Sequence, residues 1–352
     1  MTAPSPHPTP ALGQALGGPA SVALAVTEQG HVGEARRRAV ALGVTAGLTE
    51  TERGTLAVVV TEAATNLARH ATQGLLLLRV VGKPPSGVEV LALDKGPGIR
   101  DVTRAMSDGF STAGSAGHGL GAIRRMAGEF DLFSMPETGT ALFARVDAAA
   151  RSTEAELERS ATGVVCLPMA TERACGDAWL IDRTPHRTLV ALADGLGHGF
   201  DAARAAGIAI HTAVERARHS PAQIIEAAHT VMGSTRGAAV AVAEIVPSEH
   251  RVTFAGIGNI AAAIASPQDT KSLASHNGIV GHEMRTVREF TYEWADAACL
   301  IMHSDGIRAR WQLGAYPGLA AHHPALVAGT LFRDFTRGRD DATVLAVRVR
   351  ER

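Results

Sequence analysis

A polar stretch near the middle of the chain separates two different successions of apolar segments. It runs from Asp147 to Ser160 and carries an acidic residue at every second position from Glu154 to Glu158. The chain has 352 residues, and a single hydrophobic core usually stops growing before that length. We therefore expect two folded domains and a linker between them: residues 21–147, linker 148–160 and residues 161–352.

Before the linker, short β-rich runs alternate with segments of helical periodicity. Strands are predicted where β-branched and other apolar residues run together, and helices where apolar residues recur every three or four positions. The predicted strands are 21–27, 75–81, 88–93, 130–134 and 140–146. The predicted helices are 32–42, 50–71 and 119–127. This succession indicates an α/β sandwich.

After the linker, strands come first, helices follow, and strands return. The predicted strands are 163–169, 178–182, 189–193, 238–245, 251–255, 260–264, 299–303 and 342–349. The predicted helices are 202–218, 222–233 and 324–335. Blocks of this kind indicate stacked sheets with helices outside them, so the expected fold class is α+β.

The charge balance and the cysteines limit the classes of partner and compartment. Lys plus Arg number 34 and Asp plus Glu number 35, so we predict protein or small-molecule partners and no nucleic acid or anionic membrane. The three cysteines, Cys166, Cys175 and Cys299, form no Cys-x-x-Cys pair. An odd, scattered set disfavours both a disulfide framework and a zinc site, and it predicts a cytoplasmic protein.

The first 20 residues contain five prolines and no basic segment followed by an apolar run. They do not resemble a signal peptide, and we expect a disordered tail over residues 1–20. Apolar runs such as Leu75–Val81 are far shorter than the roughly 20 residues that cross a bilayer as a helix. We expect no membrane-spanning segment.

Aspartates stand beside a glycine or a second aspartate at four predicted strand ends of the second half. The four pairs are Gly176-Asp177, Asp194-Gly195, Asp305-Gly306 and Asp340-Asp341. A single Asp-Gly is usually a β-turn. Four carboxylates gathered at one sheet edge would repel one another unless divalent cations neutralised them, and such hard oxygen ligands favour Mg²⁺ or Mn²⁺. Two adjacent ions can activate a water and hold a phosphoryl group.

The order of these motifs resembles the PPM-type metal-dependent protein phosphatases, in particular the SpoIIE/RsbX group. The resemblance covers residues 162–350 and is carried by Asp194–Phe200, Phe254–Asn259, His303–Ile307 and Asp340–Thr343. It implies an αββα layered domain that hydrolyses phosphoserine or phosphothreonine directly, with two Mn²⁺ or Mg²⁺ ions. The implied metal ligands are Asp177, Asp194, the Gly195 carbonyl, Asp305 and Asp340, with Asp341 the second choice within its pair.

His198 lies in the same motif as Asp194 and has two interpretations. The resemblance makes it the nearest candidate for assisting proton transfer or stabilising the leaving group. In a glycine-rich turn it could instead cap the following helix. The adjacent histidines His322 and His323 would point about 100° apart on a helix, so we expect a structural role in a loop or at the surface and no shared metal.

Three motifs in the first half follow one another in a fixed order. Glu62 and Asn66 lie four residues apart and share one helix face, which alone would indicate a solvated surface. The segment Asp94–Ile99 follows an apolar strand, and Gly117–Gly121 precedes a predicted helix. Glycines at a helix N-terminus leave backbone N–H groups free to hold phosphate oxygens.

Together these motifs resemble the GHKL (Bergerat) ATP-binding fold, in particular RsbT-type switch kinases, over about residues 21–146. The resemblance implies ATP with Mg²⁺ held by Asn66, an adenine amino group donating to Asp94, and Glu62 as the base or orienter of a serine hydroxyl. The glycines that make room for nucleotide are Gly96, Gly98, Gly117, Gly119 and Gly121. The lid is longer between Thr112 and Gly117 than in the closest pattern, and that departure bears on the kinase rate.

The two resemblances imply a bacterial partner-switching regulator. The second domain would dephosphorylate a STAS-type protein, and the first would phosphorylate the same or a related partner, within a stressosome-like or anti-sigma system. In one alternative the first domain binds nucleotide and docks partners without transferring phosphate. In a second, the chain sequesters a sigma factor or its antagonist without turnover.

Overall fold

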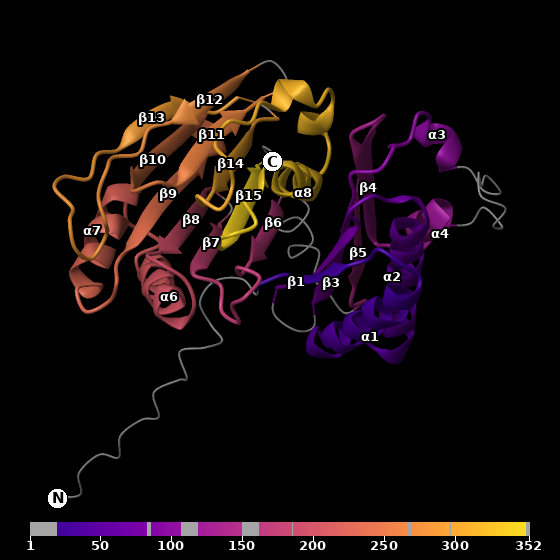
Figure 1. Ribbon diagram of the computed structural model, residues 1–352. Coiled ribbons are helices and arrows are strands. Elements are labelled where there is room, and N and C mark those ends of the chain that lie inside the picture. The colour runs from indigo at the N-terminus through magenta and orange to yellow at the C-terminus, as the bar shows by residue number, and fades with distance from the viewer. Residues whose placement is uncertain are drawn as a thin grey trace, which may run out of the picture.

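The computed structural model describes residues 20–82, 86–106, 119–149, 162–184, 186–266, 269–295 and 297–349. The predicted tail falls outside these residues except at Ala20, and so do residues 150–160 of the predicted linker. Two layered domains lie side by side (Figure 1). Among the described residues, no helix has both the length and the apolar content that a membrane crossing requires.

The first domain is one antiparallel sheet with helices on one face. Its strands, in the order β1-β2-β3-β5-β4 across the sheet, are β1 Val22–Ala25, β2 Leu75–Val81, β3 Gly87–Leu93, β5 Gly139–Asp147 and β4 Glu129–Met135. The helices are α1 Gly30–Thr45, α2 Glu50–His70, α3 Val102–Ala105 and α4 Gly119–Met126. Leu56 and Val60 of α2, together with Ile123 of α4, are fully buried and share one apolar core with the sheet.

Helix α2 begins where its sequence supplies both halves of a capping box. The side chain of Thr49 accepts from the Glu52 backbone N–H at 3.3 Å, and a Glu52 carboxylate oxygen accepts from the Thr49 backbone N–H at 2.7 Å. Two N–H groups that the first helical turn cannot satisfy are therefore bonded, which typically stabilises a helix by about 1 kcal/mol. This fixes the start of the helix that carries Glu62 and Asn66.

The second domain contains two five-stranded antiparallel sheets packed face to face. One has the order β13-β10-β9-β8-β7, and the other has the order β12-β11-β14-β15-β6. The strands are β6 Thr162–Leu167, β7 Asp177–Arg183, β8 Thr188–Gly195, β9 Ala238–Val246, β10 Arg251–Ile257, β11 Ala261–Ala265, β12 Thr270–Leu273, β13 Phe290–Glu293, β14 Cys299–His303 and β15 Ala342–Arg348. Trp179, Phe254 and Trp294 are buried between the two sheets.

Helices cover the outer faces of both sheets. Helices α6 Phe200–Glu215 and α7 Pro221–Val231 lie on the sheet that contains β8, and α8 Pro324–Phe335 lies on the sheet that contains β15 (Figure 1). Helix α7 starts at a second capping box, formed by Ser220 and Gln223, with Pro221 at its first position. The αββα layering and the preceding α/β sandwich predicted from the sequence are both confirmed.

Helix α8 also packs against the first domain, so the two domains share an apolar core. Leu91, Leu93 and Phe143 of the first sheet belong to the same buried cluster as Leu326 and Leu331 of α8. At Gly329 the helix comes so close to the sheet that an added Cβ atom would lie 2.7 Å from a Leu91 methyl carbon. The glycine therefore allows close approach of helix and sheet.

Polar contacts fix both ends of this interface. His322 Nδ1 lies 2.9 Å from an Asp131 carboxylate oxygen, and the His323 ring stacks on Phe143 with ring centres 4.0 Å apart. His323 also caps α8 by accepting from the Ala325 N–H at 3.1 Å. The structural role expected for this histidine pair and its position in a loop are therefore confirmed, and His323 is buried between the domains.

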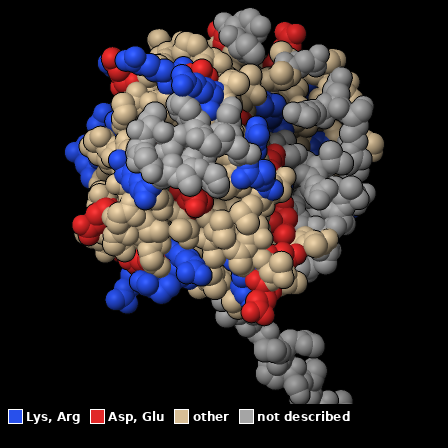
Figure 2. All heavy atoms as spheres, turned by 90° about the vertical axis from the view of Figure 1, so that its right-hand side faces the viewer, with Lys and Arg blue, Asp and Glu red and all other residues tan. Residues whose placement is uncertain are grey.

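Basic and acidic side chains both occur over the outer face of the first domain (Figure 2). The view faces the side opposite to α8, where α1, α2 and α4 lie. A mixture of signs is consistent with the near-equal totals of 34 basic and 35 acidic residues. Over the described residues of this face, the mixture of signs does not favour the binding of a polyanion.

Candidate active site

Strand pairing brings two of the predicted acidic residues together. Strand β7 begins at Asp177 and runs antiparallel to β8, which ends at Gly195. In this register Asp177 lies directly opposite Asp194, and the backbone N–H of Gly195 donates to the Gly176 carbonyl at 3.0 Å. Two carboxylates that are 17 positions apart in the sequence thus meet at one sheet edge.

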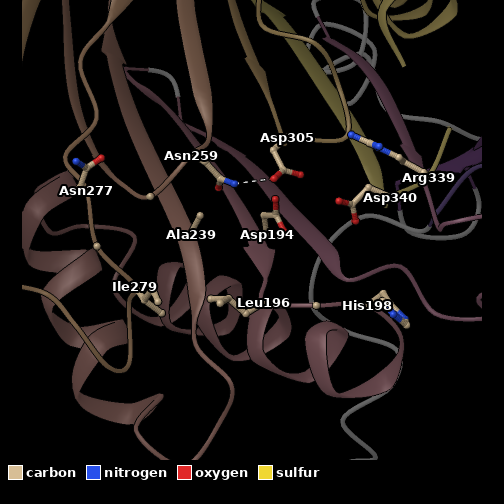
Figure 3. Close-up of a pocket in the computed structure, with 13 residues that line it drawn as sticks. Asp194, Leu196, His198, Ala239, Asn259, Asn277, Ile279, Asp305, Arg339 and Asp340 are labelled. Carbon is tan, nitrogen blue, oxygen red and sulfur yellow. Dashed lines mark hydrogen bonds between the residues drawn. The ribbon is translucent and has the colours of Figure 1, made fainter. Parts of the chain in front are cut away.

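The second sheet contributes two further aspartates to the same edge. Asp305 follows β14 and Asp340 precedes β15, and β14 and β15 are adjacent strands. Asp194, Asp305 and Asp340 line one pocket of about 540 Å³ and point toward one another (Figure 3). The other lining residues are Leu196, Gly197, His198, Ala239, Gly258, Asn259, Asn277, Gly278, Ile279 and Arg339.

The carboxylates of this pocket repel one another. Burial, and after it the neighbouring charges of Asp177, Asp305 and Asp340, together raise the pKa of Asp194 to about 8. Burial also raises the pKa of Asp177 well above its ordinary value. One Asp177 oxygen accepts from the Ser304 hydroxyl at 2.7 Å, and the other is buried without a hydrogen-bond partner among the described residues.

These observations fit a site for hard divalent cations. Cations would relieve the mutual repulsion of the carboxylates, and the Asp177 oxygen that lacks a partner would gain one. Within the described part of the chain, no three His, Cys, Asp or Glu side chains lie close enough together to hold a metal ion by themselves. Mg²⁺ commonly keeps several waters and takes one or two carboxylates, so it does not require a closed cage.

Glycines next to the aspartates are required by close backbone contacts. A Cβ atom at Gly195 would lie 2.1 Å from the Ala202 carbonyl oxygen of α6. A Cβ atom at Gly306 would lie 1.9 Å from the Asp341 carbonyl oxygen. Any side chain at either position would force the strand end away from its neighbour, so these glycines hold Asp194 and Asp305 at the pocket.

Asp340 and Asp341 have different surroundings. Asp340 lines the pocket, whereas both Asp341 oxygens accept from backbone N–H groups, Met169 at 2.8 Å and Gly176 at 2.9 Å. Asp341 thereby fixes the segment that leads into Asp177. These contacts favour Asp340 over Asp341 as the residue that faces a ligand.

His198 lies at the rim of the pocket and does not cap a helix. The N-cap of α6 is Gly199, which has a φ of 76°, and no side chain caps this end. The Nδ1 atom of His198 lies 2.6 Å from a Glu172 carboxylate oxygen. The capping interpretation of His198 is therefore wrong, and the carboxylate of Glu172 fixes the ring.

The first domain brings together another set of predicted residues. Glu62 and Asn66 lie on one face of α2, and Gly119 begins α4 against them. A Cβ atom at Gly119 would lie 3.2 Å from the Asn66 side-chain oxygen and 3.5 Å from a Glu62 carboxylate oxygen. The Asn66 amide nitrogen is buried and has no hydrogen-bond partner among the described residues. An oxygen-rich ligand between α2 and α4 would satisfy it.

Asp94 lies at the end of β3 in a tight glycine turn. Its carboxylate accepts from the Gly96 N–H at 2.7 Å, and burial raises its pKa. Gly98 has a φ of 68°, and a Cβ atom there would lie 2.0 Å from the Met135 carbonyl oxygen. Gly121 is buried within α4, and Gly117 lies outside the described residues.

Two family models match the chain, one for each domain. The Histidine kinase-like ATPase domain matches residues 25–146, and Stage II sporulation protein E (SpoIIE) matches residues 184–350. The serine/threonine-protein kinase RsbT of Bacillus subtilis (strain 168) is 34% identical over 95 residues, which are 27% of this chain and 71% of RsbT. This chain belongs to the RsbT-like ATPases and carries a SpoIIE/RsbX-like PP2C phosphatase domain.

Two further proteins are similar to parts of this chain. The phosphoserine phosphatase RsbX of Bacillus subtilis (strain 168) is 26% identical over 154 residues, 43% of this chain and 77% of RsbX. A solved structure described as "The bacterial stressosome: a modular system that has been adapted to control secondary messenger signaling" is 27% identical. It has a TM-score of 0.50 and covers 53% of this chain and 98% of that chain.

Three residues of the PP2C pocket and its rim were not predicted from the sequence. The Asn259 amide donates to an Asp305 oxygen at 2.7 Å (Figure 3). Glu172 fixes His198, and Arg339 lines the pocket next to Asp340. Asn259 is the last residue of the motif Phe254–Asn259, which already resembled the family. Its place in that motif could have identified it from the sequence. Glu172 had no such signal, since only the folded chain brings it to His198.

Proposed function

We propose that the PP2C domain removes phosphate from a phosphoserine or phosphothreonine of a STAS-type protein. The observation that carries the proposal is the crowding at Asp194, whose pKa is raised to about 8 by burial and by three neighbouring aspartates. A fold that holds carboxylates together at such a cost gains from binding cations there. When bound, two divalent ions would activate water for attack on phosphorus and hold the phosphoryl oxygens.

The protein groups have separate roles in this proposal. Asp177, Asp194, the Gly195 carbonyl, Asp305 and Asp340 would hold Mn²⁺ or Mg²⁺. Asn259 orients Asp305 through the hydrogen bond of 2.7 Å. His198, fixed by Glu172 at 2.6 Å, would donate a proton to the leaving serine oxygen or assist through a water.

We propose further that the RsbT-like domain binds ATP with Mg²⁺ and phosphorylates the same partner or a related one. Asn66 would hold the ion, Asp94 would accept from the adenine amino group, and the glycines would leave room for nucleotide. Glu62 would orient or deprotonate the attacking hydroxyl. The close approach of Gly119 to Glu62 and Asn66 supports this division of roles, because phosphates at a helix N-terminus would lie beside both.

A two-arm experiment with the full chain separates these activities. The first arm mixes Mn²⁺ with a phosphorylated STAS protein, and the second mixes Mg²⁺ and ATP with the unphosphorylated form. Asp194→Asn should abolish only phosphate release, and Glu62→Ala should abolish only phosphate transfer. If Glu62→Ala leaves transfer unchanged, the first domain is a nucleotide-binding docking module. If both variants keep the cellular effect of the chain, it acts by sequestration.

A further inference from the structure

Arg339 holds a singular position in the PP2C pocket. It immediately precedes Asp340 and is the one arginine among the residues that line the pocket. The acidic residues of the lining are Asp194, Asp305 and Asp340. Its guanidinium extends toward Asp305 and Asp340 (Figure 3). A positive group thus faces the space into which the carboxylates point.

The guanidinium of Arg339 has no polar partner among the described residues. Within the described part of the chain it makes no hydrogen bond or ion pair. Two other cationic groups near the pocket are paired: Arg236 lies 2.9 Å from Asp201, and His198 lies 2.6 Å from Glu172. Burial raises the pKa of Asp305, and Arg337 lies near enough to that carboxyl for its charge to act in the lowering direction, but Arg337 does not line the pocket. Arg339 is therefore available to a ligand without breaking a contact inside the protein.

The charges of the proposed site favour a positively charged side chain beside the phosphate. The four carboxylates of Asp177, Asp194, Asp305 and Asp340 would carry four negative charges, and two divalent cations would cancel them. A phosphate monoester dianion then brings two further negative charges, and Arg339 is the one Lys or Arg among the lining residues that could offset them. Guanidinium groups match phosphate with two parallel N–H donors, and they remain charged at all working pH values.

We infer that Arg339 binds the phosphoryl group of the substrate. The inference rests on the proposed phosphatase function and specifies which protein group recognises the phosphate. Because the neighbouring residue Asp340 faces the pocket, the backbone fixes Arg339 at one residue's distance from the proposed ions. Two of its N–H groups can then bind phosphoryl oxygens on the side away from Asn277 and Ile279, which line the other wall.

The test uses the full chain loaded with Mn²⁺ and three variants. Arg339→Ala removes the charge, Arg339→Lys keeps it without the two-donor geometry, and Arg337→Ala removes a similar exposed charge from outside the pocket lining. Calorimetry measures the affinity for inorganic phosphate and for Mn²⁺, and steady-state kinetics with p-nitrophenyl phosphate measures KM and kcat.

Arg339→Ala should weaken phosphate binding by roughly 10- to 100-fold, the usual effect of losing hydrogen bonds to a charged group, and raise KM accordingly. Arg339→Lys should lie between it and the unsubstituted chain. Mn²⁺ affinity should stay within about twofold, because Arg339 would not contact the ions. Arg337→Ala should bind phosphate almost as the unsubstituted chain does.

Unchanged phosphate affinity in Arg339→Ala would overturn the inference. An equal loss in Arg337→Ala would also overturn it, since the effect would then come from the general field around the loop. A loss of Mn²⁺ binding in Arg339→Ala would assign the residue a structural role instead. Absence of turnover in the unsubstituted chain would refute the proposed function, while the phosphate titration would still decide the role of Arg339.

Discussion

Asp194 is held where its charge is unfavourable to the folded chain. Burial and the nearby aspartates together raise its pKa from the ordinary value of 3.8 to about 8. A carboxyl whose pKa is raised on folding stabilises the folded state at low pH and loses that contribution as pH rises through the folded value. The free protein is thus weakest under the conditions in which cations bind most strongly.

Replacing Asp194 by Asn should stabilise the metal-free protein while removing its response to metal. Relief of the repulsion should raise the free energy of unfolding by roughly 1–3 kcal/mol at neutral pH. Thermal melting in a chelator and in excess Mn²⁺ measures both effects. Mn²⁺ should raise the Tm of the unsubstituted chain and leave that of the variant nearly unchanged.

Asp341→Asn is the matched comparison, because Asp341 binds the Met169 and Gly176 N–H groups and does not line the pocket. This variant should lose stability in the chelator, since an amide offers one acceptor oxygen where the carboxylate offers two. If Asp194→Asn and Asp341→Asn behaved alike, the distinction between a ligand and a structural carboxylate would be incorrect.

Asp94 predicts a pH dependence of nucleotide binding. Burial raises its pKa, and the charged carboxylate accepts more strongly than the protonated acid from the Gly96 N–H and from an adenine amino group. ATP affinity should therefore fall as pH decreases through this raised value, at a higher pH than an exposed aspartate would give. Titration with a fluorescent ATP analogue across the acidic range measures the midpoint. An affinity independent of pH over that range would contradict the assigned role.

The sequence alone does not show which of Asp340 and Asp341 faces the pocket. Both stand before the same strand, so position alone marks the pair as a site. The choice between them depends on the Met169 and Gly176 N–H groups, which reach Asp341 across more than 160 residues of sequence. Strand periodicity carries no information about such a contact. The glycines at the strand ends, by contrast, meet a local steric requirement, so they could be recognised from the sequence.

At the scale of elements, α8 packs against two sheets, which a helix with only one apolar face could not do. It covers the outer face of the sheet that contains β15, and it packs on the sheet of the RsbT-like domain. All of its residues from Pro324 to Arg333 are buried. Burial all round is typical of a helix enclosed between layers.

Arg333 at the end of α8 links the PP2C domain to the nucleotide site. Its Nη1 atom donates to the Asp94 carbonyl at 3.0 Å, next to the carboxylate proposed to bind adenine. Arg333→Ala should therefore weaken ATP binding by about three- to tenfold, the effect of one lost hydrogen bond to the Asp94 turn. Equilibrium titration with an ATP analogue measures this.

Arg310→Ala serves as the control for this prediction, because Arg310 is an exposed arginine of the same domain. It should leave ATP affinity unchanged. Equal affinities in Arg333→Ala, Arg310→Ala and the unsubstituted chain would show that the turn around Asp94 holds its shape without α8.

The long elements were predictable from the sequence, and two short edge strands, β12 and β13, were not. Helix α2 carries a capping box and β9 a long apolar run, so both signals lie within the element. Strands β12 and β13 have four residues each, lie at sheet edges and expose much of their side-chain surface. A strand that buries little of its own surface leaves no apolar run to detect, so its position depends on the partner strand.

At the scale of the whole molecule, six layers share continuous packing. They follow one another as α6 and α7, two sheets, α8, the RsbT-like sheet, and α1 and α2 (Figure 1). The sequence indicated two domains, but it did not indicate that they pack together through α8. The apolar residues of a helix show that it is buried, and they do not show whether one sheet or two sheets cover it.

We expect the full chain to unfold in one cooperative transition. The apolar core around Leu331 and Phe143 belongs to both domains, and unfolding either one would expose it to water at roughly 25 cal/mol for each Å² of apolar surface. Differential scanning calorimetry should give a single peak, and a chain that begins at residue 162 should melt at a lower temperature. Two well-separated peaks would contradict a shared core.

Mn²⁺-dependent phosphate release tests the central claim most directly. The purified full chain is mixed with a STAS protein phosphorylated on serine or threonine, and inorganic phosphate is measured as Mn²⁺ is titrated. We predict release that rises to saturation with Mn²⁺, stops on addition of a chelator, and is absent in Asp194→Asn. No release from the unsubstituted chain, or equal release from Asp194→Asn, would contradict the account.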